Sequence, residues 1–308
     1  LKLTAAGATT AAPRNSQLDP GIPKLTPRRT TRLQVTGAEG QPRAYDVGLT
    51  GVAAVTGSRQ VPNSTLVDGD QGLTDQQVVD RTGIASRQWV NDSEDAVSMA
   101  VVAWRKLLGA QQLVIDDIDL VICATTTPKS VTPSTACQIL GELADGENEP
   151  LVQAYDINAA CSGYLYGLQA AYDYLQSRPK ARVMLVTAEA LSPLVDTTDQ
   201  DTVFLFGDAS TASLLVGEAH IDSAIARVAQ PDLSAKGDNA DTLCVPFEGD
   251  GYIKMNGRKV FSEAVRAMLS SLNRACQNQG LGVGDLDLIV PHQANDRITE
   301  AIRHRIGV

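Results

Sequence analysis

Short apolar runs alternate with amphipathic stretches from Tyr45 to the end of the chain. Apolar runs of strand length predict β-strands at residues 46–57, 118–126, 151–157, 181–190 and 209–217. Because most of these runs are continuously apolar, we expect strands that are covered on both faces. The pattern therefore predicts an α/β fold with a largely buried sheet.

Apolar residues at helical spacing predict two helices between these strands. The first helix follows the strand at 46–57, and six apolar residues lie on one of its faces: Ala96, Ala100, Ala103, Trp104, Leu107 and Leu108. Asp92 or Ser93 is its expected N-cap. The second helix begins at about Cys161, and its buried side collects Leu165, Leu168, Tyr172 and Leu175.

The last third of the chain has a weaker pattern. It predicts strands at residues 221–228, 242–247, 252–255 and 286–290, a long helix at about 260–278 and a final helix from Asp296. A helix followed by Gly307 and an apolar residue commonly leads into another strand. We therefore expect the sequence to be a piece of a longer protein.

Residues 1–45 differ in composition from the rest of the chain. They are rich in Thr, Ala, Pro and Arg and show no strand or helix periodicity. Seven basic and two acidic side chains give this stretch a net charge of +5, whereas the remaining residues carry −15. The stretch is predicted to be a flexible basic extension, and a remnant of an organelle-targeting segment is the alternative.

The overall composition is that of a globular protein, with 308 residues, 43% hydrophobic and 20% charged. A net charge of −10 argues against nonspecific binding to nucleic acid or to an anionic membrane. No run approaches the ~18 apolar residues of a transmembrane helix, so we expect a cytoplasmic location. Five cysteines without a CxxC spacing predict neither a disulfide framework nor a metal site, and no cofactor is expected.

Cys161 differs from the other cysteines in its predicted position. The others fall inside strands or helices, where cysteine is usually a small buried hydrophobe: Cys123, Cys137, Cys244 and Cys276. Cys161 stands where a helix begins after a strand, so a helix N-terminus can stabilise its thiolate at the carboxyl edge of a sheet. The pattern alone leaves a nucleophile and a structural cysteine both open.

Three histidines are candidates for proton transfer near neutral pH. His292 follows the predicted strand at 286–290 and precedes a helix opened by Asn295 or Asp296. It is therefore also expected beyond the carboxyl end of a strand. The other two, His220 and His304, are expected on the surface. The positions of His292 and Cys161 in the sequence leave open whether the imidazole and the Cys161 thiol lie close together.

Six segments resemble a known enzyme family, and they are VDRTGIASR at 79–87, PSTACQIL at 133–140, DINAACSGYLYGL at 156–168, DTTDQDTVFLFGDASTASLLVG at 196–217, MNGRKVF at 255–261 and VPHQANDRI at 290–298. In this order they resemble the β-ketoacyl-acyl carrier protein synthase III group of the thiolase superfamily. The resemblance implies a duplicated five-layer α/β/α/β/α fold whose C-terminal part is incomplete here, with halves at 46–220 and 221–308. It also implies a homodimer and decarboxylative Claisen condensation of acyl and malonyl thioesters.

The resemblance assigns roles to residues at matching positions. Cys161 would carry the acyl group, and its backbone N–H would form part of an oxyanion hole. His292 would assist decarboxylation by hydrogen-bonding the developing enolate oxygen. Arg81 would contact the phosphopantetheine or nucleotide part of the donor, and Asn256 and Gly257 would line its tunnel.

The resemblance also assigns residues to the binding of a partner protein and to the space for the acyl chain. Arg297 matches a basic position that receives an acidic acyl carrier protein, and Arg303 and Arg305 match less closely. A solvated helix face explains these arginines equally well. Thr132 replaces a bulky aromatic residue contributed by the partner subunit, which suggests more room for the acyl chain.

The sequence departs from the family in two respects. The third catalytic residue, an Asn in a loop well after the histidine, lies beyond the given sequence. The Trp and Arg that sandwich the adenine of coenzyme A in family members are Gln77 and Gln200 here. Without the stacking and cation–π contacts, we expect weaker recognition of free CoA esters, which favours a donor bound to a carrier protein.

Three functions are consistent with these residues. The first is condensation, and the second is acyl transfer from Cys161 to an alcohol or amine with His292 as general base. The third is a noncatalytic pairing subunit that keeps the dimer and the carrier-protein surface. The presence of both Cys161 and His292 argues against the third.

Overall fold

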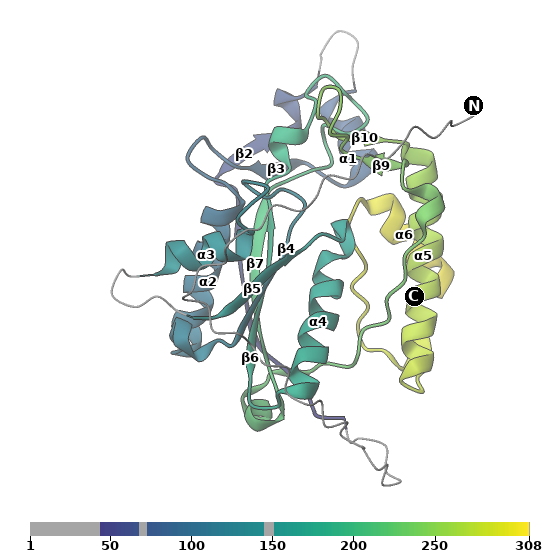
Figure 1. Cartoon of the computed structure of the whole chain (residues 1–308). Helices are drawn as coiled ribbons and strands as arrows, with labels where there is room; N and C mark the ends of the chain where they lie inside the picture. Colours follow the sequence, from purple (N-terminus) through teal and green to yellow (C-terminus); the bar gives the residue numbers. More distant parts are fainter. Residues whose placement is uncertain (1–43, 68–72, 145–150, 308) are drawn as a thin grey trace, which may run out of the picture. The chain divides into compact units, whose positions relative to one another are not determined.

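The computed structural model describes residues 44–67, 73–144 and 151–307 (Figure 1). The predicted extension at residues 1–45 lies outside the described residues, apart from its last two. Residues Ala44–Val308 form one compact unit. The expected division near residue 220 into two thiolase-like halves stays a prediction.

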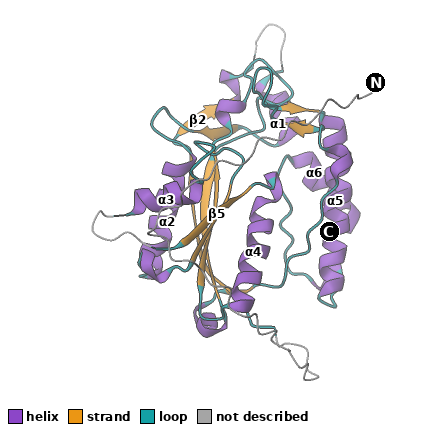
Figure 2. Cartoon of the chain, in the orientation of Figure 1, coloured by secondary structure: helices purple, strands orange, loops and turns teal. Residues whose placement is uncertain are grey.

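A six-stranded sheet in the order β5-β4-β6-β7-β1-β8 lies at the centre of this unit (Figure 2). Its strands are β1 (Gly48–Thr56), β4 (Leu120–Ala124), β5 (Gln153–Ile157), β6 (Arg182–Glu189), β7 (Ala209–Val216) and β8 (Ala226–Arg227). β4 runs parallel to β5 and β6, whereas β7 is antiparallel to β6 and β1. The five strands predicted from the apolar runs are therefore present, and the α/β fold class is confirmed.

Helices cover both faces of the sheet, which explains the long apolar runs in strands such as β4 (LVICA) (Figure 1). α2 (Ala96–Gln111) and α3 (Thr135–Leu143) pack on one face and α4 (Gly163–Ser177) packs on the other. In β4, alternate residues join the two cores, with Val121 and Cys123 on the α2 side and Leu120 and Ile122 on the α4 side. This is the two-residue period of a strand that is buried on both faces.

The N-cap of α2 is Asp95, so the expectation of Asp92 or Ser93 is wrong. The Asp95 carboxylate accepts a hydrogen bond from the Ser98 N–H (2.8 Å), and the Ser98 hydroxyl accepts one from the Asp95 N–H (2.9 Å). Ser93 instead donates its N–H to the Asn91 side chain (2.8 Å) in the preceding turn. Several polar residues in a row can each cap a helix, and the turn decides which one does.

The remaining strands are short and lie outside the central sheet. β2 (Arg59–Pro62) pairs with β3 (Ser86–Trp89), and β9 (Leu243–Cys244) pairs with β10 (Lys254–Met255). β2, β3 and α1 (Asp75–Thr82) contribute to a separate apolar cluster formed by Val61, Val78, Trp89, Val195, Val203, Phe204 and Ile253.

Two helices follow in the last part of the chain. α5 (Gly257–Asn278) and α6 (Asp296–Ile306) share an apolar cluster that includes Val265, Ile298 and Ile302. α6 also contacts α1, because a Cβ at Gly83, the C-cap of α1, would lie 2.9 Å from the Cβ of Asp296. Gly83 has a φ of 74°, so both its backbone and this close approach require glycine. In the described residues, no helix has the length and apolar character needed to cross a membrane.

The strands predicted in the last third of the chain are shorter than expected or absent from the described structure. Within 221–228 only β8 forms, since Glu218–Ser223 is a 3-10 helix. Residues 286–290 form no strand, and the Leu288 and Val290 side chains are 78% and 73% exposed. A strand needs a neighbour for its backbone hydrogen bonds, and no described segment pairs with this one. The second large sheet of a five-layer fold is therefore not formed by the described residues.

Candidate active site

Cys161 lies in a sharp turn between β5 and α4. It is the middle residue of a 3-10 helix, Ala160–Ser162, which leads directly into Gly163 at the start of α4. Ala160 has a φ of 45°, a left-handed conformation that costs a non-glycine residue about 1–3 kcal/mol. The turn leaves Cys161 exposed, as a nucleophile that must reach a substrate requires.

The helix that follows Cys161 lies very close to the sheet. A Cβ at Gly163 would lie 3.1 Å from the Cβ of Ala124, and a Cβ at Gly167 would lie 2.4 Å from Cδ1 of Leu185. Glycine at these positions lets α4 approach β4 and β6. Cys161 is thereby held at the edge formed by the carboxyl ends of parallel strands, where ligands of α/β sheets gather.

Neighbouring groups raise the pKa of the Cys161 thiol above its ordinary value. Although the side chain reaches solvent, partial burial among protein atoms is the largest cause, and a hydrogen bond to its own backbone acts in the opposite direction. The negative charge of Glu189 raises the pKa further. This differs from the expected stabilisation of the thiolate by the helix N-terminus, because burial and a nearby carboxylate both disfavour a new negative charge.

His292 lies three residues before Asn295, the N-cap of α6. The Asn295 side-chain oxygen accepts a hydrogen bond from the Ile298 N–H (3.1 Å), so Asn295 and not Asp296 opens the helix. Although His292 is exposed at the surface, desolvation by neighbouring protein atoms lowers the pKa of its imidazole, which favours the neutral form that can donate a hydrogen bond. No hydrogen bond or charge interaction joins His292 to Cys161 within the described ranges, and their pairing stays a prediction.

Thr132 lies in the exposed loop between β4 and α3, next to Pro133. Asp156 of β5 fixes the end of this loop, because its carboxylate accepts hydrogen bonds from the N–H groups of Thr135 (2.6 Å) and Ala136 (2.8 Å). The first N–H groups of a helix have no partner within the helix, so an anionic oxygen is stabilised there. Asp156 thus anchors the loop that contains Thr132 beside β5.

Arg81, Asn256 and Gly257 all lie at helix ends. Arg81 is exposed in the last turn of α1. Asn256 caps α5, where its side-chain oxygen accepts a hydrogen bond from the Lys259 N–H (3.2 Å), and Gly257 is the first residue of that helix. The structure gives Asn256 a capping role, and the expected place of these residues along a substrate tunnel stays a prediction.

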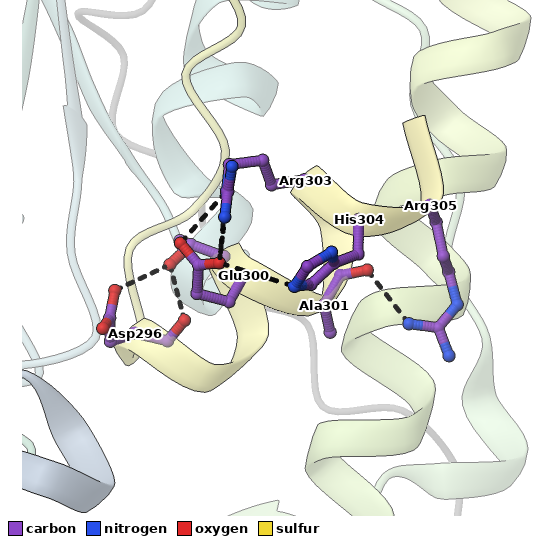
Figure 3. A network of polar contacts seen from close by, with 7 residues as sticks. Asp296, Glu300, Ala301, Arg303, His304 and Arg305 are labelled. Carbon is purple, nitrogen blue, oxygen red and sulfur yellow. Dashed lines mark hydrogen bonds and ion pairs between the residues drawn. The ribbon is translucent and has the colours of Figure 1, made fainter. Parts of the chain in front are cut away.

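The three arginines expected at a carrier-protein surface lie on α6. Figure 3 shows that Arg303 is paired with Glu300 (2.8 Å) and that the Arg305 guanidinium donates to the Ala301 carbonyl (3.0 Å). These two side chains therefore have partners within their own helix. Arg297 is exposed and forms no ion pair with the described residues. Of the three arginines, it therefore has the charge that is most available to a partner protein.

Gln77 and Gln200, at the positions of the adenine sandwich, are used by the local fold. The Gln77 side-chain oxygen accepts a hydrogen bond from the Thr74 N–H (2.8 Å) and completes the capping box of α1. The Gln200 amide donates to the Leu66 carbonyl (3.3 Å). An amide held in this way supplies neither the flat aromatic face nor the guanidinium charge that stacks on a purine.

The structure places the Cys161 thiol and its backbone N–H in the turn between β5 and α4, and the Glu189 charge acts on the thiol. Glu189 is the last residue of β6, and the sequence pattern did not single it out. A carboxylate at the carboxyl end of a buried strand is the signal that could have found it. Within residues 44–67, 73–144 and 151–307, no three His, Cys, Asp or Glu side chains are grouped so as to hold a metal ion.

Comparison with known proteins identifies the family. A family model described as 3-oxoacyl-[acyl-carrier-protein (ACP)] synthase III matches residues 155–237, which include Cys161. The β-ketoacyl-[acyl-carrier-protein] synthase III of Nitratidesulfovibrio vulgaris strain DP4 is 35% identical over 271 residues, which cover 84% of this chain and 81% of that protein. The chain belongs to the β-ketoacyl-acyl carrier protein synthase III family. The resemblance inferred from the six segments is therefore confirmed.

Solved structures show the same fold for this synthase III chain. The crystal structure of 3-oxoacyl-[acyl-carrier-protein] synthase III from Aquifex aeolicus VF5 has a TM-score of 0.74 at 29% identity, covering 85% of this chain and 81% of that one. The priming β-ketosynthase of the R1128 polyketide pathway also has a TM-score of 0.74, at 28% identity, covering 87% and 80%. The thiolase-like fold expected from the sequence is confirmed by these neighbours.

Proposed function

We propose that this chain catalyses decarboxylative Claisen condensation of an acyl thioester with a malonyl thioester through an acyl-Cys161 intermediate. The observation that carries the proposal is the exposed Cys161 in a strained turn at the carboxyl edge of parallel strands. This turn lies inside the segment that matches the synthase III family. Relatives that align over most of the chain are named as synthases of this type.

In the first half-reaction, the deprotonated Cys161 sulfur attacks the acyl carbonyl carbon. The carbon–sulfur bond of the donor breaks, and the departing thiolate takes up the proton that Cys161 has lost. The backbone N–H of Cys161 supports the negative charge that develops on the carbonyl oxygen. Because the thiolate is the reactive form and the pKa of this thiol is raised, Cys161 must lose its proton for the attack, and this proton ends on the departing thiolate.

In the second half-reaction, the malonyl thioester loses CO2 and its enolate carbon attacks the acyl carbon held on Cys161. The new carbon–carbon bond replaces the bond to sulfur, and the thiolate regains a proton. We assign His292 the hydrogen bond to the enolate oxygen. Its lowered pKa supports this role, because the neutral imidazole donates through one ring nitrogen.

An acyl carrier protein is the donor that the residues favour over free coenzyme A. Gln77 and Gln200 are engaged in hydrogen bonds of the local fold, which removes the expected adenine sandwich. Arg297 offers an exposed positive charge to an acidic partner, although the chain as a whole is acidic. Arg81 would then contact the phosphopantetheine arm.

The remaining assignments rest on the family alone. We place Asn256, Gly257 and Thr132 along the path of the arm and the acyl chain. We also propose a homodimer, with Arg303 and Arg305 at the edge of the carrier-protein surface. A cytoplasmic location completes the proposal.

The test is product formation from an acyl thioester and malonyl-acyl carrier protein by the complete protein. We expect one CO2 for each β-ketoacyl product, and we expect Cys161→Ala to abolish both. Cys137→Ala is a matched control, because Cys137 is another exposed free cysteine, on α3. Transfer of the acyl group to an alcohol or amine without release of CO2 would contradict condensation and support the acyltransferase alternative.

A further inference from the structure

Arg87 of β3 is a buried cation that forms no ion pair with the described residues. It is only 6% exposed. Its guanidinium donates to the carbonyls of Val61 (3.0 Å) and Phe204 (3.3 Å) and to the side-chain oxygen of Asn63. All three acceptors are uncharged, and they belong to three separate segments of the chain. Because a buried charge is costly without close acceptors, these hydrogen bonds hold the three segments around one side chain.

Asn63 connects this cation to the end of α1. Asn63 is fully buried, and its side-chain amide donates to the Ile84 carbonyl (2.7 Å), while its backbone N–H donates to the Ala85 carbonyl (3.1 Å). These two carbonyls come directly after Gly83, the C-cap of α1. The amide oxygen of Asn63 is used by Arg87 and the amide nitrogen by the end of α1, so one side chain joins the two.

Two further contacts hold the same end of α1. The Thr82 hydroxyl donates to the Val78 carbonyl (2.7 Å) and accepts a hydrogen bond from the Ile84 N–H (3.0 Å). Gly83 also lies against Asp296, the first residue of α6. The last turn of α1 is therefore held by its own hydroxyl, by the buried Asn63 and by α6.

Arg81 is an exposed side chain in this last turn. It comes two residues before Gly83, and Arg297 follows Asp296 on α6, so the contact between Gly83 and Asp296 brings the backbones of the two arginines near each other. A long exposed side chain meets a ligand in one geometry only when its backbone is fixed. The buried hydrogen bonds behind α1 supply that constraint for Arg81.

We propose that Arg87 and Asn63 are positioning residues for the donor: through the two carbonyls that follow α1, they hold this helix end so that Arg81 meets the phosphate-bearing end of the pantetheine arm. The inference rests on the proposed function, in which Arg81 contacts the donor. Its test measures binding in a Cys161→Ala background, where no acyl group is transferred. A failure of acylation or condensation is therefore distinguishable from a failure of this inference.

Asn63→Asp keeps the acceptor for Arg87 and removes the amide that donates to the Ile84 carbonyl. Isothermal titration calorimetry compares two ligands, acetyl-CoA and acetylpantetheine, which lacks the phosphates and the nucleotide. Arg81→Ala is expected to weaken acetyl-CoA binding about tenfold, because a charge-assisted contact is lost. Asn63→Asp is expected to weaken it about threefold, because Arg81 is misplaced and not removed. Neither change is expected to alter acetylpantetheine binding.

A double variant separates positioning from a general loss of structure. If Asn63 acts through Arg81, Asn63→Asp has no further effect in the Arg81→Ala background. Arg87→Lys keeps the positive charge and loses the forked geometry, so it is expected to behave like Asn63→Asp. Asp95→Ala, at the N-cap of α2, is the control for lost stability and should leave both affinities unchanged.

Multiplied losses in the double variant, or equal losses of acetyl-CoA and acetylpantetheine binding in Asn63→Asp, would overturn the proposal. Equal affinities for the two ligands with Arg81 intact would also overturn it, because no contact with the phosphates would then exist. If Asn63→Asp does not fold, Thr82→Val takes its place, since it removes the hydroxyl that accepts the Ile84 N–H in the same turn. An unchanged acetyl-CoA affinity in that variant rejects the proposal.

Discussion

At the scale of single residues, the proposed roles of His292 and Cys161 can be tested separately, because His292 acts in decarboxylation and Cys161 in acylation. Removing it by His292→Ala is expected to slow decarboxylation of malonyl thioester by about 100- to 10,000-fold, because a positioned proton donor contributes an effect of this size. Formation of acyl-Cys161 is expected to persist. Stopped-flow measurement of CO2 release by pre-acylated protein separates the two steps.

The pH dependence of the same step follows from the lowered pKa of His292. The neutral imidazole persists as the pH falls below the ordinary histidine value of about 6.5, and activity is lost only at still lower pH, where the ring becomes protonated. This acid limb should be absent from the residual activity of His292→Ala. His304→Ala, on an exposed part of α6, is the control and should keep the full profile. An identical profile in both variants would remove His292 from the mechanism.

At the scale of elements, Asp95 and Asp92 form a matched pair for testing the cap of α2. Asp95→Ala is expected to lower the free energy of unfolding by about 1 kcal/mol, because it leaves the Ser98 N–H without its partner. Asp92→Ala removes an exposed carboxylate that caps no helix and should change stability by less than about 0.5 kcal/mol. Urea unfolding followed by circular dichroism measures both, and equal effects would contradict the capping assignment.

Elements buried on both faces are those that the apolar pattern predicts best. β4 and β6 follow directly from their apolar runs, because the apolar residues of these strands alternate between the cores on the two faces of the sheet. The predicted strand at 286–290 has a similar run but no described neighbour. A local pattern records the preference of a segment for burial, whereas a strand also depends on a partner distant in sequence.

The candidate site also contains residues that the local sequence pattern predicts and residues that it does not. The position of Cys161 at a strand-to-helix turn could be predicted, because a strand pattern ends and a helix pattern begins around it. Glu189 could not, since its three hydrogen bonds come from threonines more than sixty positions earlier in the chain. The raised pKa of Cys161 was missed for the same reason, because part of it is caused by Glu189.

At the scale of the whole molecule, a local positive charge on an acidic chain is expected to steer an acidic carrier protein. Arg297→Glu should raise the KM for an acyl-acyl carrier protein about tenfold at low ionic strength and leave the KM for a small acyl thioester unchanged. The effect should shrink as salt is added. Arg105→Glu, an exposed charge on α2, is the control. An equal response from Arg105→Glu would point to net charge and not to a docking surface.

Acylation of Cys161 is the event on which the proposed chemistry depends, and intact-protein mass spectrometry observes it directly. The complete protein is mixed with a panel of acyl-carrier-protein and acyl-CoA thioesters, without malonyl thioester. We predict a mass gain of one acyl group per chain, largest with a carrier-protein donor, that persists in Cys137→Ala and disappears in Cys161→Ala. A mass gain that survives in Cys161→Ala, or no gain with any donor, would contradict an acyl-Cys161 enzyme.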